Sequence, residues 1–196
     1  MSALSELIPL VRRKCPGVMD LMMLDALLDA YREFCLKSEY IHESKVISPV
    51  TANTQVSLST QPDHSVLKIT SATEKRGNWG KSELQVNKDY EVSNSGSQVT
   101  FTKDRPPVTV SYVVTPDATA DPFTLTVSDD LIKRYGDKIA AGAASKLRYM
   151  PAQAWTEYGL AEKFERDFVE GCREAFRDRI ESFNEPSNRT RKRNFY

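Results

Sequence analysis

The chain has 196 residues, of which 40% are hydrophobic and 28% charged, and its 27 basic side chains balance 27 acidic ones. That length suits one domain, or one domain carrying an insert, and the composition is that of an ordinary globular protein. No apolar run approaches the roughly 18 residues of a membrane-spanning helix, and no basic stretch of a signal peptide precedes the first apolar residues. We therefore expect a protein with no membrane segment, made and used in the cytoplasm or inside something assembled there.

The even charge balance hides an asymmetry between the end of the chain and the rest. Residues 187–196, called the basic segment below, hold four basic side chains and no acidic one: Arg189, Arg191, Lys192 and Arg193. Removing these four from the 27 leaves 23 basic against 27 acidic side chains in residues 1–186, a net charge of −4. An acidic body does not suit a protein that binds nucleic acid with its folded surface.

Two amphipathic helices are predicted near the start of the chain. Residues 4–14 carry apolar side chains at helical spacing, and Pro9 is tolerated only near the first turn of a helix. Residues 15–17 (Cys-Pro-Gly) end this helix, and a second one should begin near Asp20, whose carboxylate can cap its first turn. The apolar positions of the second helix follow steps of three and four: Leu21, Leu24, Leu27, Leu28, Tyr31, Phe34 and Cys35.

The character of the chain changes from about Lys45 to Leu125, where Val, Thr and Ser dominate and turn-forming residues interrupt them. Five stretches are predicted as strands: Thr54–Ser59, Val66–Ala72, Glu83–Val86, Gln98–Phe101 and Val108–Val114. Asn94–Gly96 predicts a hairpin turn between Tyr90–Val92 and the strand at Gln98. These patterns indicate a small antiparallel sheet or barrel.

Helices return after Pro122. Ser128 or Asp129 is expected to cap a helix whose small central residues, Ala140–Ala144, permit close packing against a neighbour. A long final helix is predicted to begin at Thr156 and to end at Pro186. Its apolar face is expected along strict four-residue steps, with two flanking residues: Leu160, Phe164, Phe168, Cys172, Phe176 and Ile180, with Val169 and Phe183 beside them.

Together these elements predict an α+β fold. It is a four-helix bundle from an N-terminal and a C-terminal helical pair, with an inserted antiparallel β domain and an extended basic C-terminal tail. The two pairs must pack together, because neither can bury its apolar face alone. The expected parts are residues 1–44 (N-terminal pair), 45–126 (β-rich insert), 127–186 (C-terminal pair) and 187–196 (basic segment).

Residues suited to catalysis or metal binding are scarce. The chain lacks the phosphate-binding, metalloprotease and serine-hydrolase motifs, and its two histidines, His42 and His64, are expected to be structural or exposed. Its three cysteines, Cys15, Cys35 and Cys172, form no CxxC pair, so that buried reduced thiols are expected rather than a zinc site. We therefore expect no enzymatic activity, no bound metal and no cofactor.

A tryptophan in a predicted loop is a candidate for a contact with another protein. Trp79 lies between two glycines, with Arg76 and Asn78 before it. Its ring is either tucked under the β-rich insert or displayed at a contact surface, where tryptophan is enriched.

The basic segment is a second candidate. Basic termini often bind nucleic acid or are simply solvated. This one ends in Phe195 and Tyr196, and neutralising phosphate would gain little from them. Aromatic side chains are instead typical anchors in a crevice of a protein partner.

Two stretches of the opening helices resemble a known family. Residues 7–17 (LIPLVRRKCPG) and 26–35 (ALLDAYREFC) are similar to the start of head-to-tail adaptor proteins of tailed bacteriophages, also called head-completion or tail tubular protein A-type proteins. The order of elements resembles that of the family along the whole chain. In sequence the likeness lies mainly in residues 7–38 and 129–183.

This resemblance implies a structural protein of the virion at the head–tail junction, assembled in the host cytoplasm. Such adaptors form a ring of about twelve copies below the portal protein. They join the capsid vertex to the tail nozzle or tail tube, and they line a passage through which genomic DNA moves without sequence-specific binding.

The C-terminal extensions of these adaptors dock onto the portal, which implies a set of portal-binding residues: Arg189, Arg191, Lys192, Arg193, Phe195 and Tyr196. Arg76, Asn78 and Trp79 are candidates for contact with the tail or a neighbouring subunit. The alternatives are another tail-completion or assembly factor and, less favoured, a DNA-binding regulatory protein.

Overall fold

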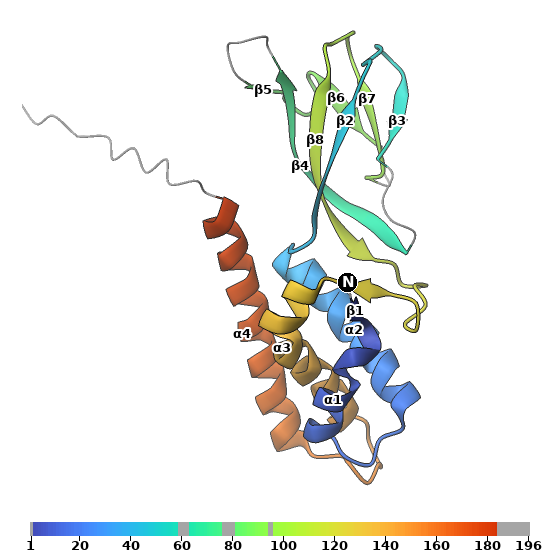
Figure 1. The fold of residues 1–196 in the computed structure, drawn as a ribbon, viewed down its shortest axis with the longest axis vertical. Helices are drawn as coiled ribbons and strands as arrows, with labels where there is room; N and C mark the ends of the chain where they lie inside the picture. Colours follow the sequence, from blue (N-terminus) through green and yellow to red (C-terminus); the bar gives the residue numbers. More distant parts are fainter. Residues whose placement is uncertain (1, 59–62, 76–80, 94–95, 184–196) are drawn as a thin grey trace, which may run out of the picture.

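The computed structural model describes residues 2–58, 63–75, 81–93 and 96–183, and it shows a helical bundle joined to a β-rich part (Figure 1). This arrangement confirms the predicted α+β fold. In chain order the elements are β1 (Ser2–Ala3), the 3-10 helix η1 (Leu4–Leu7), α1 (Ile8–Lys14), α2 (Asp20–Ser38), β2 (His42–Ile47), β3 (Gln55–Ser57), β4 (His64–Lys75), β5 (Lys81–Glu83), β6 (Tyr90–Val92), β7 (Gln98–Phe101), β8 (Val108–Pro116), β9 (Thr126–Val127), α3 (Asp129–Arg148) and α4 (Tyr158–Phe183).

The first helical stretch is divided next to Pro9. Residues Leu4–Leu7 form η1, and α1 begins at Ile8 with Pro9 in its first turn. Proline is tolerated there because the first amides of a helix have no partner within the helix. The helix predicted over residues 4–14 is confirmed with this division.

The start of α2 differs from the prediction. Met19 is the N-cap residue and no side chain caps the helix, so the predicted cap at Asp20 is wrong. The Asp20 carboxylate instead forms an ion pair with Arg12 of α1. Leu21 is 58% exposed although it was expected on the apolar face. Leu21 lies about 20° around the helix from the buried Leu28, so its exposure follows from its place in the first turn of α2 and not from the side that it faces.

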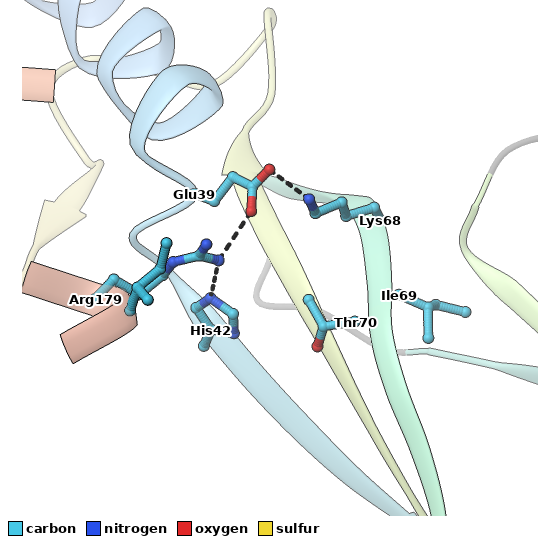
Figure 2. A pocket seen from close by; sticks show the side chains of 7 residues that line it. Glu39, His42, Lys68, Ile69, Thr70 and Arg179 are labelled. Atoms are coloured by element: carbon cyan, nitrogen blue, oxygen red, sulfur yellow. Dashed lines mark hydrogen bonds and ion pairs between the residues drawn. The ribbon is translucent and has the colours of Figure 1, made fainter. Parts of the chain in front are cut away.

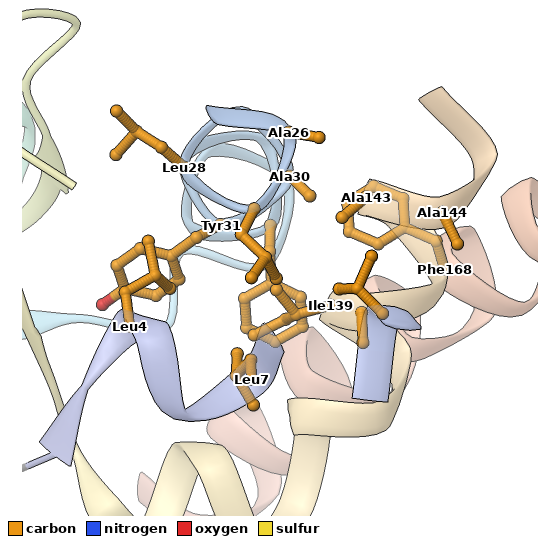
Figure 3. Close-up of a cluster of buried hydrophobic side chains, with 14 of the residues drawn as sticks. Leu4, Leu7, Ala26, Leu28, Ala30, Tyr31, Ile139, Ala143, Ala144 and Phe168 are labelled. Atoms are coloured by element: carbon orange, nitrogen blue, oxygen red, sulfur yellow. The ribbon is translucent and has the colours of Figure 1, made fainter. Parts of the chain in front are cut away.

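The core of the bundle is formed by η1, α1 and the three long helices (Figure 3). Leu4 and Leu7 of η1, Tyr31 of α2 and Ile139 of α3 belong to one buried cluster, and each is at most 2% exposed. Burying a side chain of this size stabilises the fold by about 1.5–3 kcal/mol. The predicted packing of the N-terminal helices against the C-terminal pair is therefore confirmed.

α3 and α4 approach one another closely at two glycines. A Cβ atom added to Gly142 would lie 2.5 Å from Cδ2 of Phe168, well inside van der Waals contact. One added to Gly171 of α4 would lie 2.6 Å from Cβ of Lys138. The prediction that Ala140–Ala144 permits close packing is confirmed, because the ring of Phe168 rests against the backbone of α3 at Gly142.

α3 starts where it was predicted to start, and α4 starts two residues later than predicted. Ser128 occupies the N-cap position of α3 as predicted, without a side-chain cap hydrogen bond. The hydroxyl of Ser2 donates to the Asp129 carboxylate at 2.8 Å and so ties β1 to this helix start. α4 begins at Tyr158 rather than at Thr156, whose hydroxyl donates to a carbonyl of the preceding loop.

The apolar face of α4 is shorter than predicted. Phe168 and Cys172 are each 3% exposed, but Phe176 is 37% and Ile180 43% exposed. Each step of four residues turns an α-helix by about 400°, so a strict four-residue pattern drifts by about 40° per step. After a few steps the pattern has left the side of α4 that faces the bundle. The prediction of one continuous apolar face is therefore wrong at the C-terminal end.

The β-rich part consists of two antiparallel sheets. One has the strand order β2-β8-β4-β5 and the other β3-β7-β6. Side chains of both sheets, such as Phe101 of β7 and Tyr112 of β8, form one buried cluster. The predicted small antiparallel sheet or barrel is therefore a sandwich of two sheets. A third, two-stranded sheet pairs β1 with β9 beside the bundle.

The strongest strand predictions are confirmed. β7 spans Gln98–Phe101 as expected, and β8 begins at Val108 and continues to Pro116 at the centre of its sheet. Val66–Ala72 lies within the longer β4. β6 pairs with β7 in the predicted hairpin, of whose turn residues 94 and 95 lie outside the described part of the chain.

Other strand predictions need correction. The strand predicted over Glu83–Val86 is wrong beyond Glu83, because β5 ends there and Val86 makes only an isolated bridge with Tyr90. Thr54–Ser59 is represented by the shorter β3. β2 was not predicted. It is an edge strand whose sequence, HESKVI, is mostly polar and shows no clear alternation.

The bundle and the β-rich part are joined by packing as well as by the chain. Ile41 lies between α2 and β2 and packs against the buried clusters of both parts. Nε of Arg32 in α2 donates to the carbonyl of Pro116, the last residue of β8, at 3.1 Å. Within the described residues, no helix has the length and apolar character needed to cross a bilayer.

Candidate functional site

The C-terminal end of α4 meets three other elements where the bundle joins the β-rich part (Figure 2). Four side chains gather there: Glu39 after the end of α2, His42 at the start of β2, Lys68 on β4 and Arg179 on α4. Glu39 and Arg179 stand 140 positions apart in the sequence. We call these four residues the junction cluster.

Glu39 lies at the centre of the junction cluster. Its backbone is left-handed (φ 51°, ψ 37°), and its amide donates to the carbonyl of Cys35 at 2.9 Å, which closes the end of α2. A left-handed residue commonly ends a helix in this way, although glycine is the usual choice. The turn directs the Glu39 carboxylate between two cations. One oxygen accepts from Nζ of Lys68, and the other from Nη1 of Arg179 at 2.9 Å.

Arg179 connects α4 to both parts of the molecule. Besides Glu39, its Nη1 lies 3.0 Å from Nε2 of His42 on β2, and its guanidinium lies 4.7 Å from the ring centre of Phe176. The Arg179 side chain is only 13% exposed, so these contacts are little screened by solvent. They hold the last turns of α4 against the base of the β-rich part.

The electrostatics of the cluster agree with this geometry. Burial tends to raise the pKa of Glu39, but the hydrogen bonds and charges of Lys68 and Arg179 outweigh it and lower that pKa below 4.5. Burial and the charge of Arg179 both lower the pKa of His42 below 6.5. His42 is therefore neutral at neutral pH, and its Nε2 accepts the hydrogen bond from Arg179.

A second contact holds the end of α4 from the side of α3. The hydroxyl of Tyr135 donates to the carboxylate of Asp178 at 2.5 Å. Burial and the neighbouring Asp178 together raise the pKa of Tyr135 well above its usual value. Asp178 and Arg179 are adjacent in the chain, so α4 is fixed on two sides within about one and a half turns of its last described residue, Phe183.

An open pocket of about 540 Å³ lies at the junction cluster. Besides the four cluster residues it is lined by Ile69 and Thr70 of β4 and by Ile180 of α4 (Figure 2). The pocket combines two cations with apolar side chains around a single carboxylate. We call it the junction pocket. Its chemistry suits the binding of a mixed apolar and acidic group.

The predicted contact residues do not lie in the part of the chain that the structure describes. The six portal-binding candidates from Arg189 to Tyr196 follow the last described residue, and Arg76, Asn78 and Trp79 stand between the described ends of β4 and β5. Those strand ends lie at the end of the β-rich part farthest from the bundle, whereas α4 ends beside its base (Figure 1). Both sets remain predictions.

The junction cluster was missed by the sequence reasoning. His42 was expected to be structural or exposed and is a half-buried structural residue, but Glu39, Lys68 and Arg179 were not singled out. No local pattern could have connected them, because each comes from a different element. The three cysteines are buried and unpaired, as predicted. Within the described residues, no group of three or more His, Cys, Asp or Glu side chains could hold a metal ion.

Comparison with known proteins finds a distant structural likeness. No protein-family model matches the chain, and no curated protein matches it. Among solved structures it is similar to a chain of a structure described as "Neck of empty GTA particle computed with C6 symmetry", with 14% sequence identity and a TM-score of 0.32. The match covers 84% of this chain and 92% of that one. A likeness this distant assigns no role by itself.

Proposed function

We propose that the chain is a structural, non-catalytic head-to-tail adaptor of a tailed-phage virion. In this role about twelve copies form a ring below the portal protein. The ring links the capsid vertex to the tail nozzle or tail tube and surrounds the passage for the genome. The basic segment of each copy would bind the portal, and the loop carrying Trp79 would meet the tail or a neighbouring copy.

The sequence resemblance and the order of elements support this proposal. The residues that resemble the adaptor family form α1 and α2, and they pack on α3 and α4 in one core. A β-rich part stands between the two helical pairs, as the family layout implies.

The way α4 ends is the observation that carries the proposal. A segment that binds a partner at one place needs a fixed starting point, because each additional free residue before it increases the entropy lost on binding. Tyr135 and the junction cluster hold Asp178 and Arg179 within a few residues of Phe183. The thirteen residues after Phe183 therefore start from a defined position on the body.

The distribution of charge also supports the proposal. A passage that lets DNA slide should not hold phosphate tightly, and the body of the chain carries a net charge of −4. The basic residues are collected in the one segment assigned to the portal. Several such segments engaging one portal ring would multiply their individual affinities.

Particles assembled without this chain test the proposal. We expect DNA-filled heads that lack tails and lose their genome, and addition of the purified full-length chain should restore tail attachment. Electron microscopy and nuclease protection of the packaged DNA measure the two effects. Heads that acquire tails and keep their DNA without the chain would exclude the adaptor role and favour another assembly factor.

A further inference from the structure

One exposed aromatic side chain outside the helices stands out on the surface. Phe123, in the loop between β8 and β9, is 64% exposed. The loop that carries it, residues 117–125, is called the Phe123 loop below. Isolated exposed apolar residues are common on protein surfaces, so the exposure of Phe123 alone decides nothing.

The Phe123 loop is held in place by buried side chains and by hydrogen bonds within the loop. Its residues Ala120 and Leu125 are 4% and 2% exposed and belong to the buried cluster of the bundle. The amide of Phe123 donates to the Asp121 carboxylate at 3.0 Å, and the amide of Leu125 donates to the carbonyl of Asp121 at 3.0 Å. The loop therefore presents Phe123 from a fixed base, which lowers the entropy lost when a partner binds it.

The loop is also acidic. Residues 117–125 (DATADPFTL) contain Asp117 and Asp121 and no basic residue. Both carboxylates precede Phe123 in the loop, and that of Asp121 accepts a hydrogen bond from the Phe123 amide. A pocket that accepts this loop must offer apolar contacts for the ring and positive charge near its rim.

The junction pocket has this composition. Lys68 and Arg179 supply two positive charges against the single carboxylate of Glu39, and Ile180 of α4 supplies apolar surface. Phe176, 37% exposed, continues the apolar surface one turn back along α4. A volume of about 540 Å³ is large enough for a phenyl side chain.

The two features lie on opposite flanks of the molecule. In Figure 1 the end of α4 is on one side and the loop between β8 and β9 on the other, both near the level where the bundle joins the β-rich part. Because they lie on opposite flanks, the Phe123 loop cannot reach the junction pocket of its own copy. Between copies they produce a head-to-tail contact, which closes into a ring when the rotation per copy allows it.

We propose that the Phe123 loop of one copy docks in the junction pocket of the next copy. Phe123 packs against Ile180 and Phe176, and the carboxylates of Asp117 and Asp121 face Lys68 and Arg179. This inference rests on the proposed function, because it names the contact between neighbouring copies of the ring. The occupant of the pocket is a second copy of this chain, chosen by the charge and shape of the Phe123 loop.

Cysteine cross-linking of the full-length chain tests this contact. Thr124→Cys places a thiol beside the projecting ring, and Ile180→Cys places one in the pocket; the native cysteines are buried. Under mild oxidation at high protein concentration, a mixture of the two variants should give covalent dimers, whereas neither variant alone should. A chain carrying both substitutions should give a ladder of multimers.

Two controls separate this contact from random collision. Tyr158→Cys, at the other end of α4 and 56% exposed, should not cross-link to Thr124→Cys. Adding Phe123→Ala to the Thr124→Cys chain should weaken the association about thirtyfold, as expected for loss of an aromatic anchor. Charge reversal gives an independent measurement by sedimentation: Asp117→Lys and Lys68→Glu should each reduce self-association, and mixing the two variants should restore part of it.

The proposal is wrong if the mixture gives no dimers and the charge reversals leave sedimentation unchanged. It is also wrong if Thr124→Cys alone dimerises as readily as the mixture, because that result indicates a symmetric contact. These measurements use the free protein, whereas the adaptor role is tested on heads. Normal tail attachment with no cross-linking would therefore overturn the contact and leave the adaptor role standing.

Discussion

His42 shows how a single residue of the junction cluster responds to its surroundings. In the folded chain it faces Arg179, with Glu39 and Lys68 close by and Glu43 next to it on β2. Burial and the charge of Arg179 disfavour its protonated form. A proton on His42 would remove the acceptor that Arg179 uses and add a like charge beside it.

This environment predicts a pH dependence of stability. The pKa of His42 lies below 6.5 in the folded chain, so the unfolded chain binds more protons as the pH falls through 6.5. The free energy of unfolding should therefore decrease as the pH falls below 6.5, until it passes the folded pKa. Urea unfolding at pH 7.5 and pH 5.5 measures the effect, and His42→Gln, which keeps an acceptor but does not titrate, should reduce it.

Equal pH dependence in the wild type and in His42→Gln would contradict this assignment. Glu39, the carboxylate of the junction cluster, does not titrate in this range. The pKa of Glu39 is lowered from 4.5, so its stabilising contribution is lost only at more acidic pH.

Gly142 gives a second prediction for a single residue. Gly142→Ala should destabilise the fold by about 1–3 kcal/mol, because the new methyl group would overlap the ring of Phe168. Gly159→Ala is the matched control, since an added Cβ there meets nothing within 4 Å. The control should be neutral or slightly stabilising. Chemical denaturation of both variants measures the difference, and equal stability would mean that the contact with Phe168 can relax.

At the scale of the element, α4 shows what the sequence could predict and what it could not. The existence and approximate length of the helix followed from its pattern of apolar residues. Which of those residues are buried did not, because a strict four-residue pattern drifts around the helix by about 40° per step. Phe168 faces α3 and is buried. Phe176 and Ile180 come later in the same pattern, which by then has turned away from the bundle, and they are partly exposed.

The strands show the same limit. β8 was predicted from the alternation of Val108–Val114. In the structure it lies inside its sheet, with one of its faces buried throughout. β2 was missed because an edge strand can remain polar, and its pairing with β8 is decided by the tertiary structure. The junction cluster could not be predicted for the same reason, since it depends on how distant elements pack together. It needs the left-handed turn at Glu39, the edge strand at His42 and the end of α4 at Arg179, and none has a local signature.

The drift along α4 predicts unequal consequences for two residues of one sequence pattern. Phe168→Ala should cost about 3–5 kcal/mol, since it empties a buried site between α3 and α4. Ile180→Ala should cost less than about 1 kcal/mol, because much of that side chain is already in solvent. Thermal or urea unfolding compares them. Similar losses of stability would restore the continuous apolar face that the sequence suggested.

At the scale of the whole molecule, the charge pattern separates two roles. The body carries a net charge of −4, while the last ten residues carry all four charges that offset it. A DNA-binding regulator would need positive charge on its folded surface. A chain ending at Pro186 should therefore give no mobility shift with duplex DNA at physiological salt. The full-length chain should give at most a weak, salt-sensitive one. Tight binding by the shortened chain would favour the regulator.

The basic segment can be divided into its charges and its aromatic residues. Phe195→Ala with Tyr196→Ala should weaken attachment to heads although every charge is kept, by about thirtyfold per site for a buried aromatic anchor. A variant with Arg189, Arg191, Lys192 and Arg193 replaced by glutamine is the counterpart. Normal attachment by the double alanine variant, together with failure of the glutamine variant, would make the segment an electrostatic tether.

Removal of residues 187–196 tests the adaptor role most directly. The segment follows the described core, so the shortened chain should have the same melting temperature as the full-length chain. Incubated with purified DNA-filled heads, it should fail to attach, and those heads should lose their genome or fail to acquire tails. Attachment of the shortened chain to heads at the level of the full-length chain, with its melting temperature unchanged, would contradict the central claim that this segment joins the adaptor to the portal.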